Sequence, residues 1–180
     1  MSAERLAELR RELGETRDEL SAALADADPA LLSAPGLVGE WSARELVAHL
    51  AHWNDWASTC LAAGVEGGLD ALVTEEWDVD AQNADVAREA AALPMSDVRD
   101  REAESHERFA SLLAGLDPAL LATPMPWGGT LEATVIENGP GHYAEHARHV
   151  RDWFAGADAD DPDDPDDPDD EAPPLDPADR

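Results

Sequence analysis

The chain of 180 residues contains no lysine, so all twelve of its basic residues are arginines, and its formal net charge is −29 at pH 7. This excess of negative charge argues against nucleic acid or an anionic membrane surface as a partner. Cys60 is the single cysteine, which excludes an intrachain disulfide and a four-cysteine zinc site. Tyrosine, phenylalanine and β-branched residues are scarce while alanine and leucine are abundant, a composition that favours helices over β-sheet.

Long apolar segments are also missing. No run is long enough to span a bilayer, and the N-terminal residues lack the apolar stretch of a secretory signal peptide. We therefore expect a cytoplasmic protein, monomeric or homodimeric. Its expected partner is a small-molecule substrate rather than a nucleic acid or a membrane.

The C-terminal segment differs in composition from the rest. Residues 157–180 hold 12 of the 41 acidic residues, one of the twelve bases and a repeated Asp-Asp-Pro. Like charges at this density, with little apolar content, cannot form a core, so we predict a disordered acidic tail. Residues 1–156 are predicted to form one domain.

Four segments carry apolar side chains at helical spacing and predict an all-α, four-helix bundle of the up-down type. Ser42 and Glu45 form a capping box that starts the second helix. Ser96 is expected to cap the third, and Pro140 to kink the fourth, because proline removes a backbone donor. The predicted bundle helices cover residues 2–25, 42–63, 96–115 and 131–154, and a short extra helix is expected at 78–92.

An octapeptide occurs twice. Residues 28–35 read Asp-Pro-Ala-Leu-Leu-Ser-Ala-Pro, and residues 117–124 read Asp-Pro-Ala-Leu-Leu-Ala-Thr-Pro. Each copy follows a predicted long helix and precedes a tryptophan and a further long helix. Two related helical hairpins would produce this repeat, and so would convergent capping chemistry.

Three of the six histidines lie within eight residues on the last predicted helix. His142 and His146 share one helix face, a spacing that lets two imidazoles bind one metal ion. His49 is the third predicted ligand, because facing helices of a bundle commonly share one ion. His52 and His149 remain alternative ligands, and packed or pH-sensitive histidines are the alternative to a metal site. Three neutral imidazoles leave coordination positions open and suit Zn²⁺, Ni²⁺ or Fe²⁺.

Further candidates lie beside these histidines. An arginine there could pair with a carboxylate of substrate or cofactor, although a solvated arginine is the alternative. Tryptophans could wall a pocket, although core packing explains them equally well. His106 lies among acidic residues and is expected to be solvated. The candidate catalytic residues are His149 and Arg148, the candidate cofactor-binding residues are Trp53, Trp56 and Arg151, and Trp153 is a further candidate wall.

Three motifs together resemble the DinB/YfiT-like superfamily, over about residues 1–156. They are Trp-Ser-x-Arg-Glu-Leu-Val-Ala-His-Leu at 41–50, Trp-Asp-Val-Asp-Ala-Gln-Asn at 77–83 and His-Tyr-x-x-His at 142–146. That superfamily includes the metal-binding domain of mycothiol-dependent maleylpyruvate isomerase and the ClbS/DfsB-type four-helix proteins. The resemblance implies a four-helix bundle with a divalent metal at the positions of His49, His142 and His146.

The same resemblance implies two possible functions. One is a metal-dependent transferase or isomerase that uses a low-molecular-weight thiol, such as mycothiol, on small electrophilic substrates. The other is a non-catalytic protein that binds a reactive small molecule and protects against it, as in the ClbS-like branch, which need not use metal.

Overall fold

The computed structural model describes residues 3–27, 31–73 and 78–159. These residues form helices joined by turns and contain no β-strand, since the pairings of Val38 with Trp41 and of Pro124 with Thr130 are isolated bridges. The predicted all-α class is confirmed. The last helix extends to Ala159, three residues into the predicted tail, and the rest of that tail lies outside the described residues.

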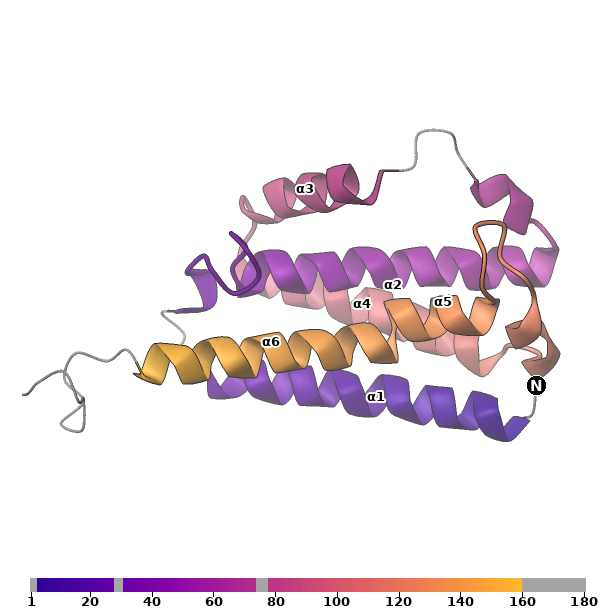
Figure 1. Cartoon of the computed structure of the whole chain (residues 1–180), viewed down its shortest axis with the longest axis horizontal. Helices are drawn as coiled ribbons and strands as arrows, with labels where there is room; N and C mark the ends of the chain where they lie inside the picture. The colour runs from indigo at the N-terminus through magenta and orange to yellow at the C-terminus, as the bar shows by residue number, and fades with distance from the viewer. Residues whose placement is uncertain (1–2, 28–30, 74–77, 160–180) are drawn as a thin grey trace, which may run out of the picture.

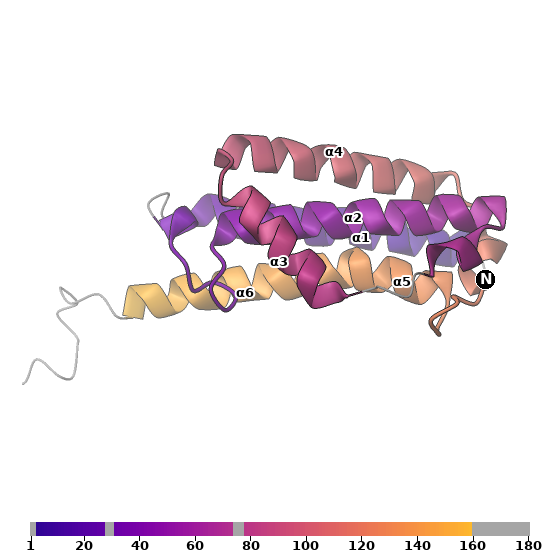
Figure 2. The same cartoon turned by 90° about the horizontal axis from the view of Figure 1, so that it is seen from above.

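Four helical rods lie side by side along the long axis of the molecule (Figure 1). α2 packs mainly on α4, and α1 packs mainly on α6. Helix α3 lies on the outer side of α2 and carries the chain back along the bundle (Figure 2). As a result α2 and α4 run in the same direction, so the up-down order that we expected does not hold for this pair. The rods are α1 (Ala3–Asp26), α2 (Ala43–Glu66), α4 (Met95–Ala114) and the tandem α5 (Leu131–Asn138) and α6 (Pro140–Ala159).

The shorter elements lie in the connections. The predicted extra helix is α3 (Val79–Ala90), and the side chain of Asp78 caps it by accepting a hydrogen bond from the amide of Ala81 at 3.0 Å. Three short 3₁₀ segments are η1 (Leu31–Ser33), η2 (Leu69–Leu72) and η3 (Pro118–Ala122). The first and third fall within the two copies of the octapeptide. Among the described helices, none combines the length and apolarity needed to cross a bilayer.

Helix α2 begins as predicted and ends later. The Ser42–Glu45 capping box is present, with the Ser42 amide donating to the Glu45 carboxylate at 2.9 Å. We expected the helix to stop before Gly64, but it continues to Glu66 and ends at Gly67, whose φ of 76° is left-handed. Gly64 is buried, and a Cβ there would lie 3.0 Å from the side chain of Leu131, so the absence of a side chain lets α5 pack closely against α2.

Helix α4 begins one residue before the predicted cap. Pro94 occupies the N-cap position and Ser96 lies inside the first turn, where its hydroxyl donates to Asp97 at 3.0 Å; the prediction that Ser96 caps the helix is therefore wrong. The expectation for His106 is also wrong. Its ring is half-buried, 5.7 Å from that of Tyr143, and burial is the main cause of its lowered pKa.

A buried polar chain connects the four rods. The guanidinium of Arg17 on α1 donates two hydrogen bonds, both 2.8 Å long, to the carboxylate of Glu102 on α4. The hydroxyl of Tyr143 on α6 donates to the same carboxylate, and the side-chain amide of Asn54 on α2 donates to that hydroxyl at 2.7 Å. Glu102 is 7 % exposed, and Tyr143 and Asn54 are fully buried. These directional bonds fix how α2 and α6 face each other.

The fourth rod is broken at Gly139. We expected one helix over 131–154 with a kink at Pro140; instead α5 ends at Asn138, and Pro140 is the first residue of α6, where its missing N–H is harmless. Gly139 is packed so closely that a Cβ would lie 2.7 Å from the Val135 carbonyl oxygen and 2.8 Å from the Phe109 ring.

Candidate metal centre

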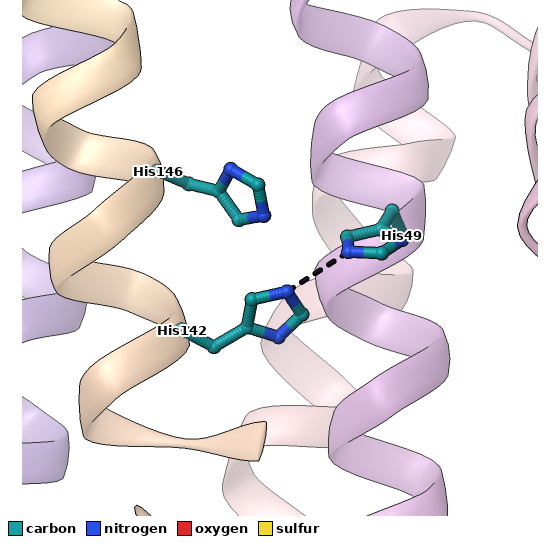
Figure 3. Close-up of side chains that lie close together, drawn as sticks. All are labelled: His49, His142 and His146. Atoms are coloured by element: carbon teal, nitrogen blue, oxygen red, sulfur yellow. Dashed lines mark hydrogen bonds between the residues drawn. The ribbon is translucent and has the colours of Figure 1, made fainter. Parts of the chain in front are cut away.

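His49 on α2 and His142 and His146 on α6 converge in the space between these two helices (Figure 3). Each offers one ring nitrogen, and the three nitrogens lie within 4.8 Å of one another. Nε2 of His49 is 2.8 Å from Nε2 of His142. The ring centroid of His146 lies 4.7 Å from that of His142 and 5.4 Å from that of His49.

This donor set could hold a metal ion. A tetrahedral ion with metal–nitrogen bonds of about 2.0–2.1 Å keeps its ligand nitrogens about 3.3 Å apart. The 2.8 Å between the Nε2 atoms of His49 and His142 therefore needs to widen by only a few tenths of an ångström. Three nitrogen ligands also leave at least one coordination position for a small molecule.

The protonation state of the three rings suits metal binding. Burial is the largest cause of the lowered pKa of each ring, and repulsion from neighbouring histidines acts in the same direction, while the hydrogen bond with Asn83 partly opposes the shift of His49. The resulting pKa is about 4 for His49, about 3 for His142 and about 2 for His146. All three imidazoles are therefore neutral at pH 7, and a neutral imidazole has the lone pair that a metal ion requires.

The orientation of His49 is fixed from α3. Its Nδ1 lies 3.0 Å from the side-chain oxygen of Asn83, and the indole N–H of Trp53 donates to the same oxygen at 3.0 Å. The same indole N–H also lies 3.2 Å from Nδ1 of His49, farther than from the Asn83 oxygen. Because an amide oxygen only accepts, the tautomer that satisfies both of its contacts has the proton of His49 on Nδ1 and the lone pair of Nε2 facing His142. Such a partner orients a metal ligand and sets its tautomer. The sequence did not single out Asn83, although it ends the motif at 77–83.

A cavity of about 540 Å³ adjoins the histidines. His49 and His142 line it, and so do two of the tryptophans predicted as walls, Trp53 and Trp56. A third indole, Trp127, comes from the loop between η3 and α5, and its ring centroid lies 5.7 Å from that of Trp56. The arrangement places a ligand-sized apolar chamber directly beside the candidate coordination site.

A family model described as the DinB superfamily matches residues 12–151. The chain belongs to the DinB superfamily. Two solved structures share its fold. An uncharacterised protein from Escherichia coli UTI89 has a TM-score of 0.70 and 17 % identity, over 85 % of this chain and 94 % of that one. A protein from Streptococcus pneumoniae has a TM-score of 0.61 and 13 % identity, over 82 % and 89 % of the two chains. Identities this low show the fold alone. No curated protein matches the chain.

The alternative ligands of this DinB member lie outside the cluster of three. Nε2 of His52 is 3.3 Å from the side-chain oxygen of Gln82 on α3. His149 is half-buried, and its Nδ1 lies 3.2 Å from Nδ1 of His146, so one of these two nitrogens donates to the other. His149 thus contacts a candidate ligand directly.

The remaining predicted site residues of the DinB chain do not line the cavity. Arg148 is exposed, forms an ion pair with Asp152 at 3.3 Å and has one guanidinium nitrogen 3.3 Å from Nε2 of His149. Arg151 is exposed. Trp153 packs against Phe154, with ring centroids 4.6 Å apart.

Proposed function

We propose that this chain binds one divalent metal ion through His49, His142 and His146 and uses it to transfer a low-molecular-weight thiol to a small electrophile. The observation that carries the proposal is the cluster of three neutral histidines, two buried and His142 half-buried, beside a cavity of about 540 Å³. Zn²⁺, Ni²⁺ and Fe²⁺ all suit imidazole ligands. When bound, such an ion lowers the pKa of a coordinated thiol, so that it reacts as a thiolate.

The chain's own residues would divide the remaining tasks. Asn83 holds His49 in the tautomer that can bind metal. Trp53 and Trp56 form cavity walls that exclude water from the reacting groups. His149, which contacts His146 but does not line the cavity, is the proposed acceptor of the proton that the thiol loses, with Arg148 beside it. Arg151 is the remaining proposed cofactor contact, from the exposed surface of α6.

The sulfur nucleophile must come from a small molecule. Cys60 is the only cysteine of the chain, and its side chain is fully buried. Burial raises the pKa of its thiol to about 12, so almost none of it is thiolate at neutral pH. This supports an external thiol, such as mycothiol, as the cosubstrate.

Elemental analysis of protein purified without metal-affinity chromatography tests the metal site. We expect about one divalent ion per chain in the wild type, because three nitrogen ligands complete one site. His49→Ala should lose the ion. His52→Ala, which removes a neighbouring imidazole bound to Gln82 instead of the cluster, should retain it. Loss of metal from His52→Ala with retention in His49→Ala would show that the ligands are assigned wrongly.

A thiol panel of mycothiol, bacillithiol and glutathione with a generic electrophile tests the reaction. We expect metal-dependent turnover with at least one thiol. Metal binding without turnover with any thiol would favour the non-catalytic alternative, in which the apolar cavity captures a reactive small molecule in the manner of the ClbS/DfsB-type proteins.

A further inference from the structure

The mouth of the cavity exposes much apolar surface. Val73, Val79 and Trp127 all line it, and they are 56 %, 43 % and 48 % exposed. They account for half of the large hydrophobic side chains that are exposed in the described part of the chain. Apolar side chains concentrated in one concave place mark a site for an apolar ligand, whereas single exposed ones need no explanation.

The charged side chains that line the same cavity are all acidic. They are Glu137 on α5 and Glu145 on α6, both at its solvent-exposed side, and among the described lining residues there is no arginine. The chain contains no lysine that could reach in. Arg148 is turned to Asp152, and it does not line the cavity. At the side away from the histidines, a carboxylate ligand would therefore meet like charge without a compensating arginine or lysine among the described lining residues.

The indole rings of the cavity also favour a cationic ligand. Trp56 and Trp127 pack against each other with ring centroids 5.7 Å apart, and the π-electron density of indole rings attracts cations. Glu137 and Glu145 are exposed, so water screens their charges, and each contributes only a modest attraction to a positive group at the edge of the cavity.

We propose that the cavity selects an organic cation with an apolar body, such as an aliphatic or aromatic amine. Its apolar part packs against Trp56 and Trp127, and its ammonium group lies towards Glu137 and Glu145. The inference rests on the proposed function in taking this cavity as the substrate pocket, and it names the class of substrate: an amine that presents its reacting group to the histidine cluster from the opposite end.

Three probes of matched shape and different charge test the selection: phenylbutylamine, phenylbutanol and phenylbutyrate. Binding to the full-length protein is followed at pH 8 by calorimetry and by quenching of tryptophan fluorescence. The protein is used as purified and after treatment with EDTA, because a bound metal ion would itself attract the carboxylate. We expect the amine to bind about tenfold more tightly than the alcohol, and the carboxylate to bind most weakly.

A pair of double variants identifies the source of the preference. Glu137→Gln with Glu145→Gln should bring the amine within about twofold of the alcohol, while the affinity for the alcohol stays unchanged. The control is Glu104→Gln with Glu107→Gln, which removes the same charge from exposed positions on α4 that do not line this cavity. It should leave all three affinities as in the wild type.

Three results with the EDTA-treated protein would overturn the proposal: alcohol or carboxylate binding as tightly as the amine, no binding of any probe, or an equal loss of amine affinity in both double variants. None of these results depends on metal content or thiol turnover. Protein without metal or turnover that still prefers the amine would refute only the proposed function. Protein with both that prefers the carboxylate after EDTA treatment would refute only the amine selection.

Discussion

Nδ1 of His49 lies 3.0 Å from the side-chain oxygen of Asn83, in a hydrogen bond that crosses from α2 to α3. The bond matters because it decides which nitrogen of His49 carries the proton. With the proton on Nδ1, the lone pair of Nε2 is directed to the cluster with His142 and His146. Asn83, which is outside the cluster, thus orients the metal-binding nitrogen of His49.

Replacing Asn83 with leucine should weaken metal binding about 10–100-fold, because His49 would lose the acceptor that sets its tautomer and ring orientation. Competition with a chromophoric chelator measures the affinity. Gln82→Leu is the matched control, since Gln82 contacts His52 from the adjacent position on α3. Equal affinities in the two variants would contradict a positioning role for Asn83.

The metal-free protein should lose stability on acidification because the pKa values of His49, His142 and His146 are lowered in the folded state. Their pKa values of about 4, 3 and 2 are below the value of about 6.5 expected for the unfolded chain. The unfolded state binds more protons below pH 6.5, so this contribution is fully present above about pH 6.5 and falls as the pH drops towards the folded pKa values. Each histidine lowers the free energy of unfolding by up to about 1.4 kcal/mol per pH unit.

Urea titrations at pH 7 and pH 5, in EDTA, measure this contribution. In His142→Gln the difference in the free energy of unfolding between the two pH values should be about 2 kcal/mol smaller than in the wild type. Comparing the two proteins cancels the effect of the many exposed carboxylates. An unchanged difference would mean that His142 titrates normally in the folded state.

Removing the hydroxyl of Tyr143 should destabilise the bundle. Tyr143→Phe keeps the ring but deprives the buried carboxylate of Glu102 and the amide of Asn54 of a partner, at a cost of about 1–3 kcal/mol. Ser58→Ala is the control, because its hydroxyl bonds only to the backbone carbonyl of Asn54 within its own helix, and it should cost less than about 1 kcal/mol. The midpoints of urea unfolding distinguish these outcomes. Equal losses of stability in the two variants would show that the hydrogen bonds linking Asn54, Tyr143 and Glu102 do not stabilise the bundle.

Two glycines should respond to alanine in opposite directions. Gly139→Ala forces a methyl group against the Val135 carbonyl and the Phe109 ring and should cost about 1–3 kcal/mol or more. It should also weaken metal binding, because His142 follows three residues later. Gly14→Ala lies within α1 with no atom near the new methyl group, and it should add about 0.5–1 kcal/mol. Thermal unfolding and chelator competition measure both, and a harmless Gly139→Ala would refute the close packing at the break.

Sequence patterns within single helices predict much of the fold and part of the site. The capping box at Ser42, the short helix after Asp78 and the common face of His142 and His146 each follow from residues within one or two helical turns. The position of His49 opposite that face required a further assumption, that facing helices share ligands.

The parts that sequence reasoning missed depend on contacts between distant segments. Asn83 reaches the site from a separate helix and Trp127 from a loop, and no residue spacing within either segment predicts that they lie near the histidines. Pro140 predicts an interruption, and the break falls at the residue before it, Gly139. Sequence reasoning missed why that residue is glycine: Phe109, thirty residues earlier, fills the space that a side chain would need. The buried Glu102 looks like any surface acid until Arg17 and Tyr143 are placed around it.

Helix α3 buries only Ala90 among its twelve residues, yet it supplies the partner of His49 and, through Val79, part of the cavity wall. An element with so little buried surface opens by local unfolding at a smaller free-energy cost than unfolding of the whole bundle. Each such opening would uncover the chamber and release the His49 ring at the same moment. The same opening of α3 would then control both the entry of a ligand and the orientation of His49 for metal binding. A ligand that contacts both α2 and α3 would hold α3 closed and slow amide hydrogen exchange throughout that helix.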